Sequence, residues 1–382
     1  MSEFDIKIKY YYCELQNKLK DTRDNRGKKH DLSVVILLFM YAIIRSSGFL
    51  NYLKIHRQMM RDAAFIQKKL GLEKKECISY TQLKRILSTI DYQEFNEINN
   101  NVFGKTIKEE GRKWESIDGK ELRGTINKII GKKRSENLIQ QVSHEDKENE
   151  VIGFYNGSKE SEKTVVKSFF NERSNLSTEA FSLDALHTDT SLLETINKKS
   201  GTYLVQIKAN QKKLLEESEH THQNLCSKHQ FSSIEKGHGR LEKRNAYLYN
   251  FNIECLDDRW KNTGIQTLIA IKRERTILKI SKKSEEIVYF ISNLKLSKVV
   301  GLELFNAVRN HWIIEADHYV RDVTLGEDKI QCLKENIPRV MAVAIGTVLN
   351  LLRRKNKKNN IRELRENLVR NRRLANQCFC AK

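Results

Sequence analysis

The segment Leu32–Ile44 contains thirteen consecutive residues without a charge, a glycine or a proline. A helix that crosses a bilayer needs about 20 predominantly apolar residues, so this run is too short to span a membrane. A helix that is apolar on all sides is stable where protein surrounds it. The run therefore predicts a buried helix in a chain that is large enough to cover it.

The residues around this run are also expected to be helical. Leu50–Gln67 and Thr81–Phe103 follow it, and apolar residues recur in them at helical spacing. Glycine is sparse in this part of the chain, and the alternation typical of strands is absent. We therefore expect residues 1–110 to form an all-α domain.

The pattern changes at Trp114, where short strand-like segments begin to alternate with short helical ones. Three antiparallel-type strands followed by a strand–helix–strand unit predict an α/β fold, a mixed sheet flanked by helices. We expect this domain to span residues 111–350, with a polar inserted subdomain at about 210–290. The expected strands are Trp114–Gly119, Leu138–Ser143, Glu150–Tyr155, Ala180–Leu186, Tyr203–Ile207, Gln266–Ile271 and Ile287–Ser292. The expected helices are Thr164–Asn171, Ser191–Lys199, Gly301–Val323 and Met341–Leu352.

The charge of the chain favours a polyanionic partner. Lys and Arg number 69 against 49 Asp and Glu, so the formal net charge is +20. The excess positive charges repel one another in a folded chain, and a polyanionic partner would offset this repulsion. Nucleic acid is a better candidate for that partner than a membrane surface. The alternative is a compositional bias, which the single proline fits. Residues 351–382 are expected to form a basic helical tail, in which Arg353 and Arg354 contact DNA phosphates or simply face solvent.

Several classes of protein are not expected. The sequence contains no glycine-rich phosphate loop and no tandem repeat, so a nucleotide-driven or solenoid protein is disfavoured. Seven scattered cysteines form no zinc or disulfide pattern, which indicates a reducing cytoplasm. Residues 1–31 are too charged for a secretory signal. We therefore expect a cytoplasmic protein.

Three acidic residues occupy unusual positions. Asp118 ends a predicted strand just before Gly119, although such a pair is also typical of a hairpin turn. Asp184 interrupts an apolar strand, where an unpaired charge is costly, although it can also order the turn that follows. Glu315 falls on the apolar face of the helix from Gly301, so we expect it to face the interior. A hydrogen-bonded polar cluster in the core is the alternative for Glu315.

Two strand-end aspartates and a helical glutamate can hold two divalent cations about 3.5–4 Å apart. Carboxylate oxygens favour Mg²⁺ or Mn²⁺, and such a pair of ions activates a water or a 3′-hydroxyl for attack on a phosphodiester. We therefore predict two Mg²⁺ (or Mn²⁺) ions per active site, held by Asp118, Asp184 and Glu315. A zinc site made of His311, Glu315 and His318 is the competing interpretation, but its spacing matches no known zinc motif.

Six motifs of the sequence carry a resemblance to a known family. They are SIDGKELRGT (Ser116–Thr125), SLDALHT (Ser182–Thr188), YLVQIKANQ (Tyr203–Gln211), GHGRLEKR (Gly237–Arg244), ISNL (Ile291–Leu294) and RNHWIIEADHYVRDVTLGED (Arg309–Asp328). Together they resemble bacterial insertion-sequence transposases of the H-repeat-associated group, a branch of the DDE transposases with an RNase H-like catalytic core. The resemblance runs from Leu32 to about Ile345 and includes the helical N-terminal part.

The resemblance implies a transposase that binds the terminal inverted repeats of its insertion sequence and catalyses Mg-dependent DNA cleavage and strand transfer. The implied catalytic residues are Asp118, Asp184 and Glu315. The implied DNA-binding residues are Lys120, Arg123, His187, Lys208, Arg240, Arg244, Arg309 and His311, and His238 shares one of the motifs. The segment after Glu315 is one residue shorter than is common in the family, which affects the contacts that follow this acid.

The implied partners are double-stranded DNA, both element ends and target, and further copies of the chain, as a homodimer or higher oligomer in the synaptic complex. The N-terminal helices are expected to read the ends, in a bacterial cytoplasm and associated with the nucleoid, without a membrane. Two alternatives stay open: a domesticated, catalytically silent DNA-binding or regulatory protein, and a Mg-dependent nuclease that cuts without joining.

Overall fold

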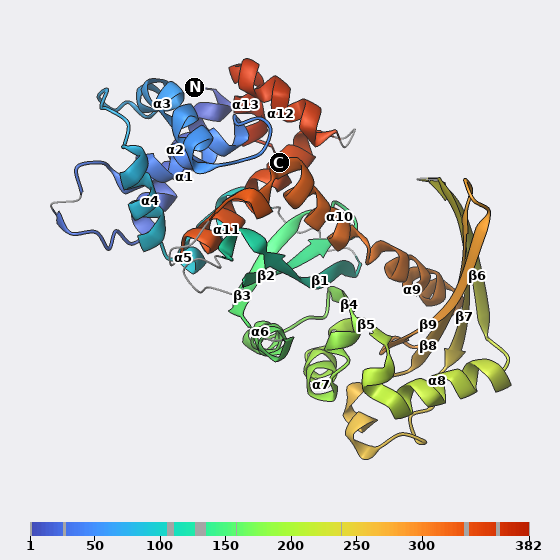
Figure 1. Cartoon of the computed structure of the whole chain (residues 1–382). Coiled ribbons are helices and arrows are strands. Elements are labelled where there is room, and N and C mark those ends of the chain that lie inside the picture. The colour runs from blue at the N-terminus through green and yellow to red at the C-terminus, as the bar shows by residue number, and fades with distance from the viewer. Residues whose placement is uncertain are drawn as a thin grey trace.

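A nine-stranded mixed sheet forms the centre of this computed structural model (Figure 1). The structure describes residues 2–25, 28–104, 111–126, 135–157, 159–237, 239–331, 336–356 and 360–381. The described strands follow the order β3-β2-β1-β4-β5-β9-β8-β7-β6. They are β1 (Lys113–Leu122), β2 (Glu136–Ser143), β3 (Asn149–Asn156), β4 (Glu179–Leu183), β5 (Thr202–Ile207), β6 (His229–Gly237), β7 (Arg240–Asn250), β8 (Thr267–Ile277) and β9 (Lys282–Ser292).

The sheet confirms the predicted α/β fold. β1 pairs in parallel with β4, and β4 with β5, while the other neighbouring strands are antiparallel. In β5, Tyr203 and Val205 join one buried cluster while Leu204 joins another. A strand that is covered on both faces reads as a continuous apolar run, which is why this segment could be predicted as a strand.

Helices cover both faces of the sheet (Figure 1). α6 packs against one face through Val166 and Phe170, in the same cluster as Ile117 of β1. α9 packs against the other face through Leu304 and Phe305. The helices are α1 (Glu3–Lys18), α2 (Leu32–Ile44), α3 (Tyr52–Leu70), α4 (Tyr80–Thr89), α5 (Tyr92–Phe103), α6 (Lys159–Glu172), α7 (Thr190–Lys198), α8 (Lys212–Asn224), α9 (Lys298–Asn310), α10 (Ile313–Tyr319), α11 (Ile337–Lys355), α12 (Ile361–Arg370) and α13 (Arg372–Phe379).

The segment predicted as an inserted subdomain continues the central sheet. β9 pairs with β5, and β6 to β9 form an antiparallel arm that projects beside α9 (Figure 1). In β8, the first five residues are buried and the remaining six are not. The sequence predicted strand only at the buried part, because the outer part of the arm lacks an apolar face.

The apolar run at Leu32–Ile44 forms α2, and all thirteen of its residues are buried. The prediction of a buried helix is therefore confirmed. α1, α3, α11 and α13 pack around it. Within the described part of the chain, no helix combines the length and the apolar content that a membrane crossing requires.

The C-terminal helices do not form a separate basic tail. One hydrophobic cluster contains residues of α1 to α5 together with Val340, Leu368, Cys378 and Phe379 from α11 to α13. The N-terminal helices therefore share their core with the C-terminal ones, and the helical lobe is built from both ends of the chain. The prediction of a tail was wrong because the run of Arg and Lys conceals an apolar stripe on α12 and α13.

Phe379 provides a test of this shared core, since its ring is 1 % exposed and contacts the rings of Phe4 and Tyr41. We expect Phe379→Ala to lower the free energy of unfolding by about 3–5 kcal/mol, because the deletion leaves a cavity. Arg373→Ala, at an exposed position of the same helix, should change it by less than about 0.5 kcal/mol. Urea denaturation measures both values, and equal stability of the two variants would contradict the shared core.

Candidate active site

Asp118 and Asp184 lie side by side where the parallel pairing of β1 with β4 ends, although β1 continues to Leu122, beyond its predicted end at Gly119, and pairs Asp118 with Gln140 of β2. The last pair in the register of β1 and β4 is Ile117 with Leu183, and each aspartate is the next residue in its strand direction. The Asp118 carboxylate accepts a hydrogen bond from the Gly119 amide at 2.8 Å. The Asp184 carboxylate accepts one from the Leu186 amide at 2.9 Å, so it also orders the turn after β4.

The closeness of the two aspartates has an electrostatic consequence. Burial and then the charge of Asp184 raise the pKa of Asp118 to about 7, against the hydrogen bond from Gly119, which lowers it. Two adjacent carboxylates repel each other, and a divalent cation relieves this repulsion. The pair therefore fits a hard cation such as Mg²⁺ or Mn²⁺.

A cluster of serine and histidine side chains lies beside the aspartates. Ser116 of β1 and Ser182 of β4 have hydroxyl oxygens 3.0 Å apart, and each lies within 3.1 Å of Nε2 of His144. His311 joins the cluster through Nδ1, 3.0 Å from the Ser182 hydroxyl. Burial lowers the pKa of His311, and the charge of Asp184 opposes this shift. His311 therefore lies close to the carboxylate pair.

Glu315 does not face the interior as predicted. The expected helix Gly301–Val323 is divided into α9, which ends at Asn310, α10, which begins at Ile313, and a π-helical turn over Val320–Leu325. This division moves the buried face, so that Trp312 and Tyr319 are exposed as well as Glu315. Burial of its carboxyl group still raises the pKa of Glu315.

The direction of Glu315 follows from the same helix. His311 and Trp312 keep right-handed helical backbone angles, so His311 and Glu315, four residues apart, lie on one face. Asp317 points the other way, because its carboxylate accepts a hydrogen bond from Gln140 of β2 at 2.7 Å. Asp317, and not Glu315, is thus the carboxylate of α10 that faces the sheet.

Among the described residues, no group of three His, Cys, Asp or Glu side chains is arranged to hold a metal ion. Asp118 and Asp184 are the two carboxylates that could hold one, and Glu315 would reach it from the exposed side. The predicted assignment of these three residues to catalysis and metal binding stays a prediction.

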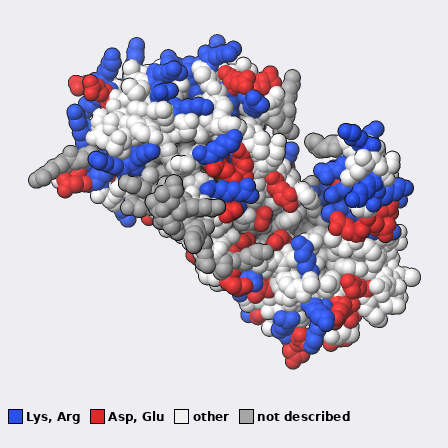
Figure 2. All heavy atoms as spheres, viewed as in Figure 1, with Lys and Arg blue, Asp and Glu red and all other residues white. Residues whose placement is uncertain are grey.

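Three predicted DNA-binding arginines line one cavity. Arg240, Arg244 and Arg309 surround a cavity of about 510 Å³ between the arm and the end of α9, together with Lys236, Arg275, Trp312, Glu235 and Glu242. Arg244 donates to Glu235 at 3.1 Å and to Glu242 at 2.6 Å, so part of the positive charge is neutralised. Figure 2 shows Lys and Arg gathered over this arm, above a band of acidic residues.

Two further predicted DNA-binding residues are exposed, and one of them lies near the carboxylates. Lys208 follows β5, and its charge is among those that lower the pKa of His311. The Arg123 side chain is 71 % exposed, 3.8 Å from Asp328. His238 lies outside the residues that the structure describes.

Lys120 lies in the interior instead of on a DNA-facing surface. Its side chain is 4 % exposed, and its ammonium group lies 2.7 Å from Asp322, 3.3 Å from Glu327 and 3.4 Å from Asp328. An ammonium group that is surrounded by three carboxylates is not available to phosphate. The prediction for Lys120 was wrong because its carboxylate partners are about 200 residues away in the sequence, beyond the reach of local patterns.

Three other predicted DNA-binding residues are also enclosed by protein. His187 is 0 % exposed. Arg353 lies 2.6 Å from the buried Asp317, and Arg354 donates to Glu148 at 2.6 Å. These arginines end α11 and fix it to the loop before β3 and to α10. A basic run in the sequence does not show which arginines find carboxylate partners, and the assignment of these three residues to DNA stays a prediction.

Sequence reasoning missed Glu162, which is 7 % exposed and whose charge raises the pKa of Asp118. It lies four residues before Val166 and eight before Phe170, both of which are fully buried in α6. This helical spacing was the available signal, because it places Glu162 on the inward face of the helix.

Comparisons with known proteins agree with the resemblance. The chain is 26 % identical over 343 residues to "Putative transposase YncI" of Escherichia coli O157:H7, covering 88 % of this chain and 85 % of that protein. It is 25 % identical over 351 residues to "H repeat-associated putative transposase YhhI" of Escherichia coli (strain K12), covering 87 % and 88 %. It is equally identical over 343 residues to "Putative protein YbfL" of the same strain. No family model matches the chain. The resemblance to H-repeat-associated transposases is thus confirmed over most of the chain.

The raised pKa of Asp118 predicts a pH-dependent effect of Asp118→Asn in metal-free buffer. The folded protein holds a proton on Asp118 up to about pH 7, whereas an unfolded chain releases it near pH 4. Stability contributed by this residue is therefore lost as the pH rises from about 4 to 7. We expect Asp118→Asn to be about 2–4 kcal/mol more stable than the unaltered protein at pH 8 and nearly equal to it at pH 4.

Urea denaturation at both pH values in EDTA measures this difference. Asp258→Asn, whose side chain is 89 % exposed, is the matched control and should show no pH-dependent difference. A variant at Asp118 with the same stability difference at pH 4 and pH 8 would contradict the raised pKa.

Proposed function

We propose that this protein is a DDE transposase that binds the terminal inverted repeats of its insertion sequence and catalyses Mg-dependent DNA cleavage and strand transfer. The register of β1 and β4 carries this proposal, because it brings Asp118 beside Asp184 although 65 residues separate them. The resemblance to named transposases over most of the chain supports it. So does the strand order β3-β2-β1-β4-β5, with β1, β4 and β5 parallel, which fits an RNase H-like core.

Each residue of the site would have a separate role in the reaction. Asp118 and Asp184 would hold the cations, and Glu315 would reach them from the exposed face of α10. Two bound Mg²⁺ ions supply Lewis acidity at the attacking and the leaving oxygen of a phosphodiester. His311 would hold α10 against the strand ends through its contact with Ser182.

The basic cavity supports the proposal of DNA binding. Arg309 and Trp312 line it, and His311 lies between them in the sequence, beside the carboxylate pair. A DNA strand in this cavity would therefore run onto the acidic site. We propose double-stranded DNA as the partner, bound by a homodimer or higher oligomer in the bacterial cytoplasm, with the N-terminal helices reading the element ends.

A DNA cleavage assay tests the catalytic assignment. Supercoiled plasmid that carries the element's ends should be cut in Mg²⁺ but not in EDTA. We expect Asp184→Asn and Glu315→Gln each to lower the cleavage rate at least about 10²-fold, because each removes a metal-binding carboxylate that is worth several kcal/mol in the transition state. Glu366→Gln, at a 61 % exposed position on α12, is the control and should cleave normally.

The same assay separates the two alternatives. The first alternative is a catalytically silent DNA-binding or regulatory protein. DNA binding without cleavage in any divalent cation would support that alternative. Cleavage without joined products would support a nuclease, and cleavage in EDTA would exclude the metal mechanism.

DNA binding measured at several salt concentrations tests the basic cavity. We expect Arg240→Ala and Arg309→Ala each to weaken binding and to lower the slope of log K against log salt by about 1, since each loses one phosphate contact. Arg354→Ala should lower stability but leave the slope unchanged, because its guanidinium is held by Glu148. An equal loss of slope in all three variants would argue against a cavity-specific contact.

A further inference from the structure

A further acidic side chain, that of Glu162, lies near the aspartate pair on the face of the sheet that α6 covers. Glu162 in the first turn of α6 approaches β1 at Gly119, the residue after Asp118. A Cβ atom built on Gly119 would lie 2.9 Å from the Glu162 carboxyl carbon. The absence of a side chain at residue 119 therefore lets this carboxyl group reach the strand beside Asp118.

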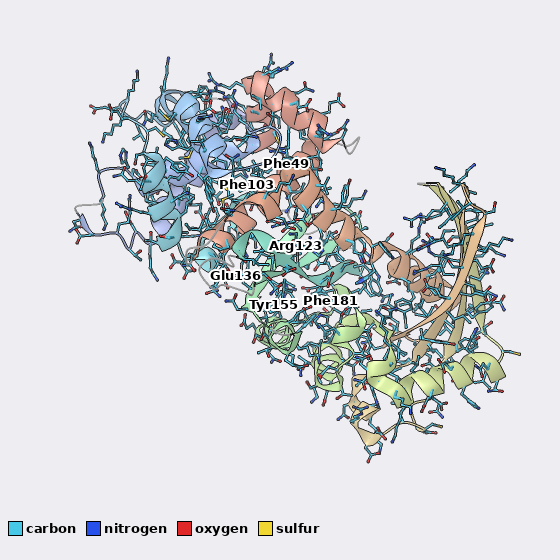
Figure 3. The ribbon with its side chains drawn as sticks, in the orientation of Figure 1. Phe49, Phe103, Arg123, Glu136, Tyr155 and Phe181 are labelled. Carbon is cyan, nitrogen blue, oxygen red and sulfur yellow. The ribbon has the colours of Figure 1, made fainter. Side chains whose placement is uncertain are left out.

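Two neighbours hold the Glu162 side chain in this place. The Tyr155 hydroxyl of β3 donates to Oε2 of Glu162 at 2.7 Å, and Tyr155 lies between the sheet and α6 (Figure 3). Nε2 of His187 lies 3.4 Å from Oε1 of Glu162 and 3.9 Å from Oδ1 of Asp184. His187 thus lies between the new carboxylate and one of the two aspartates.

His187 supplies an independent sign that this place is built for a ligand. Its side chain is 0 % exposed, and within the described residues neither ring nitrogen has a hydrogen-bond partner. A buried polar group without such a partner costs free energy, so each one calls for an explanation such as strain, a catalytic role or an ordered water or ion. This imidazole faces two carboxylates at distances that a small shift would turn into hydrogen bonds.

We propose that Glu162 is a further acidic side chain of the site, which adds its negative charge to Asp118 and Asp184 for a divalent cation, and that His187 links it to Asp184. This inference rests on the proposed function. Glu162 acts as a positioning and electrostatic residue. It lies on α6, on the buried side of the site, whereas Glu315 lies on an exposed face of α10. The charge of Glu162 on Asp118 is consistent with this role.

Titration of the metal-free protein with Mn²⁺, followed by isothermal titration calorimetry, tests the inference. Removing a charge near a bound cation costs more than a tenfold loss of affinity at a low effective dielectric constant, so Glu162→Gln should weaken Mn²⁺ binding about tenfold or more. Glu162→Asp keeps the charge and should stay within about threefold of the unaltered protein. Glu160→Gln, at a 78 % exposed position of the same helix, should leave the affinity unchanged.

Two further variants separate the possible failures. Tyr155→Phe removes a hydrogen bond that holds Glu162 but no charge, so it should lower the melting temperature and weaken Mn²⁺ binding less than Glu162→Gln does. Equal Mn²⁺ affinity of Glu162→Gln and the unaltered protein would overturn the inference and reduce Glu162 to a partner of Tyr155. If Asp118→Asn also bound Mn²⁺ normally, the metal site of the proposed function would fail as well. If Asp118→Asn lost Mn²⁺ binding and Glu162→Gln did not, the role of Glu162 would be overturned and the metal site of the proposed function would stand.

Discussion

The parallel pairing of β1 with β4 is the constraint on which the candidate site depends. Its register ends at Ile117 and Leu183, so the two aspartates follow the last parallel pair side by side, Asp118 within β1 and Asp184 just after β4. A shift of this register by one residue would turn one aspartate to the other face of the sheet. The apolar residues of β4 hold the register, since Ala180, Phe181 and Leu183 are all buried.

This placement has an electrostatic cost that the fold must carry. Burial, followed by the charges of Asp184 and Glu162, raises the pKa of Asp118 and so disfavours its ionised form. Packing of both sheet faces supplies the stability that offsets such a local penalty. Functional sites commonly retain ionisable groups that are unfavourable for folding. Here a bound cation would remove the repulsion between the carboxylates.

Much of the fold could be predicted from the sequence because most core elements carry a strong local pattern. The thirteen-residue run of α2 and the continuous apolar run of β5 are examples, since burial on all sides leaves a signal within the segment itself. The outer part of the arm could not be predicted, because it has little apolar face. The C-terminal helices were misjudged, because the ten Lys and Arg of residues 353–373 drew attention away from the apolar stripe by which α12 and α13 reach the shared core.

The candidate site could be predicted in part, for the same reason. Asp118 and Asp184 interrupt strands, and that interruption is visible locally, whereas the orientation of Glu315 depends on the break between α9 and α10. Ile314 and Asp317, not Glu315, are the buried residues of α10, so the apolar face extrapolated from α9 does not continue through it. The partners of Lys120 and Arg353 lie far away in the sequence, so no local pattern could show that both are enclosed by carboxylates.

Those enclosed cations explain how an exposed Glu315 can still have a defined position. Lys120 of β1 binds Asp322 after α10, and Arg353 of α11 binds Asp317 within it. Arg321, which is fully buried, binds Glu327 through two hydrogen bonds of 2.9 Å. Buried ion pairs add little net stability because desolvation opposes them, but each fixes one geometry. The basic residues expected to touch DNA therefore serve a different purpose: they fix α10 across β1, β2 and α11, and so give the exposed Glu315 a defined position.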